Sequence, residues 1–105
     1  MPIDREAMLR KFIDQKPDDP FPRYALAIEL MNGGRAEDAT AVFAALVERI
    51  PGYVPTYLHY AATLGKLGRR DEARSVLGAG VERARETGDG HALGELQGAL
   101  AALSS

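Results

Sequence analysis

A spacing of 34 residues recurs along the chain and constrains its fold more than any other feature. When the sequence is shifted by 34 positions, residues 27–49 lie over residues 61–83. The identical pairs are Ala27/Ala61, Leu30/Leu64, Gly34/Gly68, Arg35/Arg69, Ala39/Ala73, Val42/Val76, Ala45/Ala79, Val47/Val81, Glu48/Glu82 and Arg49/Arg83. Composition alone gives roughly two identities over such a window. The chain therefore contains two copies of one structural unit.

Apolar residues recur every three or four positions through nearly every segment, which is typical of amphipathic helices. Helices are expected at about 20–33, 36–50, 54–67 and 70–87, with one more at each end of the chain. The first begins near Pro2, Ile3 and Asp4, and Gly33-Gly34 and Gly88 are breaks that suit helix ends. No segment alternates apolar and polar residues as a half-buried strand would. The fold class is therefore all-α.

Composition limits the classes of function. The 105 residues suit a single domain, and 13 basic residues interleave with 15 acidic ones to give a net charge of −2. No unopposed basic stripe exists, so we expect no nucleic-acid partner. The chain has no cysteine and no apolar run long enough for a signal peptide or a membrane span. We therefore predict no membrane partner and a cytoplasmic location.

Small residues stand at the expected crossing point of each helix pair, where they let two backbones approach closely. They are Ala27 and Ala39 in the first unit and Ala61 and Ala73 in the second. A 34-residue pair of helices with this pattern resembles the tetratricopeptide repeat from about residue 18 to residue 85. Two positions depart from it. Arg23 replaces an early aromatic residue, and Arg85 replaces the closing proline that Pro51 supplies in the first copy.

The resemblance implies a right-handed α-α superhelix of five or six helices. We predict one domain over 1–105, with a capping helix in 1–17, repeats at 18–51 and 52–87, and a capping helix in 88–105. Because Arg85 is not proline, the last helix of the second repeat should continue to Thr87. Gly94 and Gly98 suggest a close helix contact, either with Gly78 and Gly80 or across a dimer, and the contact within the chain is the simpler reading.

In this family the first helix of each repeat lines a concave face where partners dock as peptides or helices. Carried over to this sequence, the binding residues are Phe21, Tyr24, Ile28, Met31 and Asn32, then Leu58, His59, Ala62 and Lys66. Ala25, Gly94, Glu95 and Gly98 complete the predicted face. Met31 and Leu58 are expected to be exposed, whereas packing and exposure are equally balanced for Phe21. The face is mainly apolar.

Family members that grip chaperone tails use lysine, arginine and asparagine on this face. Tyr24, Ile28, His59, His91 and Glu95 stand at the corresponding places, so the resemblance predicts no such clamp. An apolar groove suits an unidentified protein partner that presents an apolar peptide or an amphipathic helix. The alternative is a homodimer or other self-association through the same apolar face, or a purely structural role.

Catalysis finds little support in the sequence. His59 and His91 are the only histidines and lie on different predicted helices, without a cysteine or a carboxylate pattern that would hold a metal. The glycine-rich breaks follow helices rather than strands, so they are not phosphate loops. We therefore predict no enzyme activity, no cofactor and no metal.

Overall fold

The computed structural model describes residues 4–104, and these residues form helices without any strand. The helices are α1 (Arg5–Gln15), α2 (Pro20–Asn32), α3 (Ala36–Arg49), α4 (Pro55–Lys66), α5 (Arg70–Thr87) and α6 (Gly90–Ser104). The all-α prediction is confirmed. Pro2 and Ile3, expected at the start of the first helix, lie outside the described residues.

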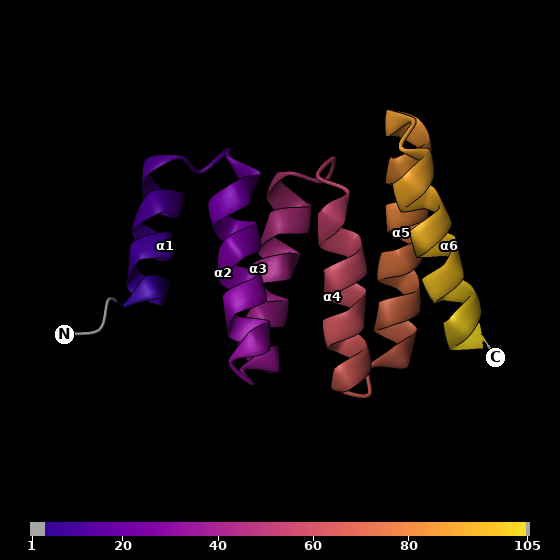
Figure 1. The fold of residues 1–105 in the computed structure, drawn as a ribbon, viewed down its shortest axis with the longest axis horizontal. Helices are drawn as coiled ribbons and strands as arrows, with labels where there is room; N and C mark the ends of the chain where they lie inside the picture. The colour runs from indigo at the N-terminus through magenta and orange to yellow at the C-terminus, as the bar shows by residue number, and fades with distance from the viewer. Residues whose placement is uncertain (1–3, 105) are drawn as a thin grey trace.

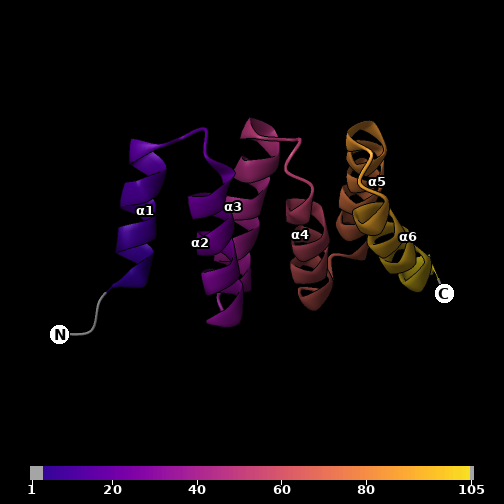
Figure 2. The same ribbon diagram turned by 45° about the horizontal axis from the view of Figure 1, so that its top comes forward.

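The helices run up and down in chain order and form an elongated array of 46 × 29 × 20 Å (Figure 1). Each helix packs on the next one along the chain. In addition, α2 contacts α4 and α4 contacts α6, whereas α1, α3 and α5 do not contact one another. The layer of α2, α4 and α6 is therefore the tighter one, on the inside of the curve. Figure 2 shows the same order of helices in a turned view, in which α2 overlaps α3 and α5 overlaps α6.

Aspartates start the first two helices. Asp4 Oδ1 accepts a hydrogen bond from the Ala7 amide at 3.1 Å, and Asp19 Oδ1 accepts one from the Phe21 amide at 3.0 Å. Each carboxylate satisfies an amide that has no partner inside its helix. The helix starts are thus determined locally by the sequence.

Glycines end three helices because the chain there needs a left-handed backbone. Gly34, Gly68 and Gly88 have φ values of 78°, 76° and 73°, which other residues adopt only with strain. Gly34 and Gly68 are separated by the 34-residue period and form the same turn in both repeats. With Arg85 in place of a proline, α5 continues to Thr87 before Gly88 ends it.

Alanines occupy the crossing points of the helix pairs, as the sequence predicts. Ala27 and Ala39 are fully buried where α2 crosses α3, and Ala61 and Ala73 are buried where α4 crosses α5. Their small side chains allow the backbones to approach while larger neighbours interlock. These contacts hold α2 against α3 and α4 against α5.

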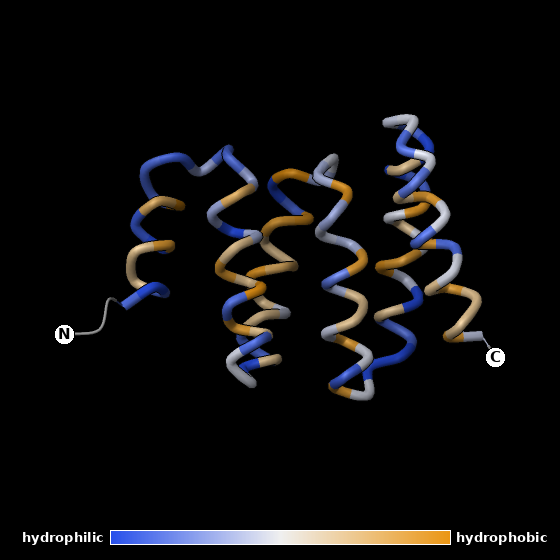
Figure 3. The backbone as a smooth tube through the Cα atoms, in the orientation of Figure 1, coloured by the Kyte–Doolittle hydropathy of each residue, from blue (hydrophilic) through white to orange (hydrophobic). Residues whose placement is uncertain are grey.

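Hydrophobic residues recur on every helix (Figure 3) and form two cores. One core lies among α1, α2 and α3 and the other among α4, α5 and α6, and Tyr60 packs against both. Its ring stacks on Phe43 with the centroids 5.7 Å apart and the planes 17° from parallel. The buried members of the first core are Leu9, Leu26, Ala27, Leu30, Ala39 and Phe43. Those of the second are Val54, Tyr57, Ala61, Leu64, Ala73, Leu77, Val81, Ala84 and Leu96.

One glycine prediction is wrong. The contact of Gly94 and Gly98 with Gly78 and Gly80 within the chain is not formed, because Gly78, Gly94 and Gly98 all face open space. The alternative contact across a dimer stays a prediction. Only Gly80 makes a close contact. A Cβ added there would lie 2.6 Å from Tyr57 Cβ, because α5 packs directly on α4 at this point.

Candidate functional site

The nine predicted binding residues lie on α2 and α4, in the inner layer. Phe21, Asn32, Ala62 and Lys66 are exposed, and the other five are half-buried. Phe21 has the greatest exposure of the large hydrophobic side chains, at 64%. The structure thus brings apolar side chains of two helices to one surface.

Aromatic side chains meet where α2 and α4 begin. The Tyr24 ring lies edge-on to both Tyr53 and His59, with 5.5 Å between ring centroids in each pair. Burial raises the pKa of Tyr24, and the neighbouring Tyr53 raises it further. The Tyr24 hydroxyl therefore stays protonated at neutral pH and can donate a hydrogen bond to a ligand.

Tyr53 is missing from the predicted site because it precedes α4, in the loop after Pro51-Gly52. Reading helical stripes cannot place a loop side chain. The available signal was an aromatic residue two positions before Pro55, in a short loop that leads into the inner layer. The aromatic group of Tyr24, Tyr53 and His59 thus includes a residue that helical periodicity missed.

Met31 and Leu58 are half-buried, which corrects the expectation that both are exposed. The Thr63 hydroxyl lies 3.0 Å from Met31 Sδ and 2.8 Å from the His59 carbonyl oxygen. Its single proton can serve only one of these acceptors at a time. Met31 therefore packs into the contact between α2 and α4. Leu58 loses exposure because α6 lies beside it.

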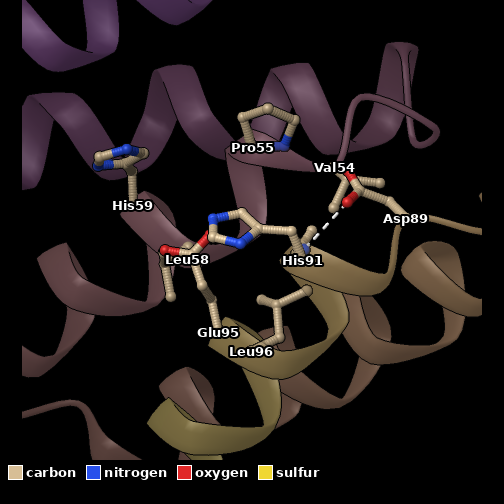
Figure 4. Close-up of a pocket in the computed structure, with 9 residues that line it drawn as sticks. Val54, Pro55, Leu58, His59, Asp89, His91, Glu95 and Leu96 are labelled. Atoms are coloured by element: carbon tan, nitrogen blue, oxygen red, sulfur yellow. Dashed lines mark hydrogen bonds and ion pairs between the residues drawn. The ribbon is translucent and has the colours of Figure 1, made fainter.

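A hollow of about 250 Å³ lies between the first turns of α4 and α6 (Figure 4). Leu58 lies at its centre, and His59 and His91 approach it from the two helices. His91 Nε2 lies 3.2 Å from Glu95 Oε1, and Asp89 Oδ1 accepts a hydrogen bond from the Ala92 amide at 3.0 Å. The lining residues are Val54, Pro55, Leu58, His59, Asp89, His91, Ala92, Glu95 and Leu96.

A second hollow of about 260 Å³ continues between α4 and α6 and shares Leu58 with the first. Its lining contains no charged side chain. The lining residues are Leu58, Ala61, Ala62, Gly65, Leu77, Ala99, Ala102 and Leu103. Together the two hollows form a groove along α4 and α6, which we call the α4/α6 groove. It has polar groups at one end and an apolar floor at the other.

The groove differs from the predicted surface in its position. The prediction centred on α2 and α4, whereas the hollows lie between α4 and α6. Among the predicted residues, Leu58, His59 and Ala62 line the groove. Glu95 also lines it, whereas Gly94 and Gly98 do not.

The described residues show neither a metal site nor a membrane-spanning helix. No group of three histidine, aspartate or glutamate side chains within residues 4–104 is placed to hold a metal ion. No helix in the same range is both long enough and apolar enough to cross a bilayer.

Two solved structures resemble the chain closely. A tetratricopeptide repeat domain protein from Salinibacter ruber is 43% identical, with a TM-score of 0.79 over 84% of this chain and 89% of that one. A protein from Bordetella parapertussis is 25% identical, with a TM-score of 0.80 over 99% of this chain and 90% of that one.

More distant structures share the fold alone. The TPR2B domain of yeast Sti1, solved in a complex with pHsp70, has a TM-score of 0.85 at 19% identity, over 94% of this chain and 79% of that one. No curated protein gave a significant match. A tetratricopeptide repeat profile matches residues 30–103, which is more than half of the chain. Together with the all-α array and the Salinibacter relative, this match shows that the chain belongs to the tetratricopeptide repeat family.

Proposed function

We propose that the chain is a non-catalytic interaction module that holds an apolar peptide or an amphipathic helix in the α4/α6 groove. The observation that carries this proposal is the pair of adjoining hollows that share Leu58. A peptide side chain placed there would contact Leu58, Ala61 and Leu96 and leave water on binding. Burying such a side chain contributes about 1.5–3 kcal/mol. Family members generally act as scaffolds without catalytic activity, which supports the non-catalytic part of the proposal.

The aromatic group of Tyr24, Tyr53 and His59 extends this surface toward α2. Tyrosine provides a large apolar ring and a polar tip, a combination suited to interfaces. Exposed Phe21 follows in the same layer. A ligand that extends beyond the groove would therefore cross aromatic rings. The predicted residues on α2 keep a role in this proposal as the outer part of the binding surface.

The polar end of the groove adds selectivity. Asp89 and Glu95 are acidic, and His91 lies against Glu95. We infer that an apolar peptide with a basic flank is preferred over an acidic one. The array lacks a cationic clamp on this face, because Tyr24, Ile28 and His59 stand where the clamp would need lysine or asparagine.

Peptide selection tests the proposal. A peptide library displayed on phage and selected on the immobilised chain should enrich sequences with two or more apolar residues. Their affinity should fall at least about tenfold, or about 1.4 kcal/mol, for Ala62→Glu. Ala62 is exposed and lines the groove, so this change places a charge there without disturbing the core.

Ala44→Glu is the matched control, because Ala44 is exposed on α3, in the outer layer. It should leave the affinity unchanged. Equal affinity for both variants, or a selection that enriches no apolar peptide, would rule out this groove as the binding site.

A further inference from the structure

Phe12 is exposed at a position that is buried in both repeats. Moving forward from Phe12 by the 34-residue period reaches Leu46 in α3 and Gly80 in α5. Leu46 is fully buried and Gly80 is buried against Tyr57 of α4, whereas Phe12 is 45% exposed. In α5 this position packs on Tyr57 of the preceding helix α4 and on Leu96 of the following helix α6. Within residues 4–104, α1 contacts only α2, so no helix covers this face of α1.

A second residue on this face of α1 is likewise more exposed than its counterparts in the two repeats. Met8, at the position of partly buried Val42 and Val76, is 40% exposed. Arg5, at the position of the crossing alanines, points to α2 and pairs with Glu29 at 3.0 Å. The side of α1 that carries Met8 and Phe12 is therefore an apolar surface whose counterpart is covered in each repeat.

Helix α6 also carries a face that is less covered than its counterpart in the repeats. It aligns with α4 at an offset of 36 residues, which places Leu93, Gln97 and Leu100 on Tyr57, Ala61 and Leu64. These α4 residues are buried against α5. In α6, Gln97 is exposed and both leucines are only partly buried. Among residues 4–104, α6 therefore matches the first helix of a repeat with no second helix packed on it, and α1 matches the second helix of a repeat with no first helix packed on it.

We propose that α6 of one copy packs on α1 of a second copy in the way that α4 packs on α5. The two uncovered faces are complementary halves of one repeat, and the two pairs within the chain show the packing. Leu93, at the position of Tyr57, would then cover Phe12, which is exposed in the single chain. At the crossing position, Arg5 Nε can keep its pair with Glu29 while the remaining N–H groups of the guanidinium donate to the amide oxygen of Gln97.

The side chains that would meet in the inner layer, from α2 of the second copy and α6 of the first, are also complementary in size. In this contact α6 of the first copy takes the place of α4, and α2 of the second copy takes the place of α6. Gly94 of the first copy then stands where Leu58 stands in α4, and Phe21 of the second copy stands where His91 stands in α6. Phe21 is 64% exposed, and a side chain at Gly94 or Gly98 would meet open space. The ring can therefore lie on these glycines, which are otherwise unfavourable inside a helix. The contact removes three exposed aromatic or methionine side chains from water, namely Met8, Phe12 and Phe21.

The contact joins the α6 face of one copy to the α1 face of the other. A pair of copies therefore still has one free α1 face and one free α6 face, and further copies can add to both. Such a head-to-tail contact produces an open chain unless its rotation closes a ring. A dimer that pairs one face with itself stops at two copies. The growth of the assembly distinguishes the two arrangements.

Sedimentation equilibrium from about 5 to about 500 μM, a range that spans micromolar affinities, tests the proposal. The average mass of the wild-type chain should rise with concentration beyond twice 11.3 kDa. Phe12→Asp blocks the α1 face and Gly94→Arg blocks the α6 face, so each variant alone should remain at the mass of one chain. Met8→Asp is a second α1 variant, and circular dichroism shows whether each variant is folded.

An equimolar mixture of Phe12→Asp and Gly94→Arg provides the decisive measurement. The first variant retains a working α6 and the second a working α1, so the mixture should form pairs and stop at two chains. Gly78→Arg places the same new side chain in open space on α5 and should assemble like the wild type. The proposal is overturned if the wild type stays at one chain or stops at two, or if the mixture stays at one chain or grows beyond two.

Discussion

Gly80 shows how a single methyl group decides the packing of two helices. Alanine is better than glycine in a helix by up to about 1 kcal/mol. At Gly80, however, the added Cβ would lie 2.6 Å from Tyr57 Cβ, and a Cβ cannot rotate away. Overpacking of this kind costs about 1–3 kcal/mol. We expect Gly80→Ala to lower the free energy of unfolding by about 1 kcal/mol in a urea titration.

Gly78→Ala is the matched control on the same helix. The added methyl group meets nothing within 4 Å, so only the gain in helix propensity remains. This variant should be more stable than the wild type by up to about 1 kcal/mol. If both variants are stabilised equally, the contact between Gly80 and Tyr57 does not limit the packing of α5 on α4.

At the scale of whole helices, α6 depends on its first turn. Asp89 Oδ1 accepts from the Ala92 amide, and the Asp89 carbonyl accepts from the Leu93 amide at 3.0 Å. Removing the carboxylate leaves the Ala92 amide without this partner. Asp89→Ala should therefore lower the free energy of unfolding by about 0.5–2 kcal/mol, measured by thermal or urea unfolding.

Asp89→Asn separates capping from charge. Asparagine caps helices about as well as aspartate. Asp89→Asn should therefore keep most of the stability that Asp89→Ala loses. A loss as large as that of Asp89→Ala would show that the negative charge, rather than the capping hydrogen bond, stabilises α6.

The same scale shows what sequence can and cannot predict in this protein. The period and the crossing alanines were enough to predict the all-α fold and the family, because both are repeated local patterns. The prediction did not include the hollows between α4 and α6, because they depend on how closely α6 approaches α4, which no local pattern encodes. Gly94 and Gly98 illustrate this limit. Their spacing suggested a contact either with Gly78 and Gly80 or across a dimer, and within the chain they face open space.

For the molecule as a whole, buried tyrosines predict how stability depends on pH. Burial raises the pKa of Tyr24, Tyr57 and Tyr60 above the ordinary value of about 10. The unfolded chain therefore loses these protons first. The stabilising contribution is complete below pH 10 and is lost as the pH rises through the folded values. We expect the free energy of unfolding to be lower at about pH 10.5 than at about pH 8 in urea titrations, with the loss beginning near pH 10.

Tyr60→Phe tests the contribution of one tyrosine. Phenylalanine can keep the stacking on Phe43 and removes the group that titrates. The fall in stability at alkaline pH should be smaller in this variant than in the wild type. An identical pH dependence would show that ionisation of Tyr60 does not affect unfolding.

The position of Tyr60 between the two cores also has a consequence for cooperativity. In repeat proteins the stability is approximately a sum of the units and of the contacts between neighbours. Tyr60 packs against both cores, so it contributes to the coupling between α1–α3 and α4–α6. A ligand in the α4/α6 groove stabilises the second half directly. A second half that the ligand keeps folded also keeps Tyr60 in place against the core of α1–α3, so the shared contact is maintained.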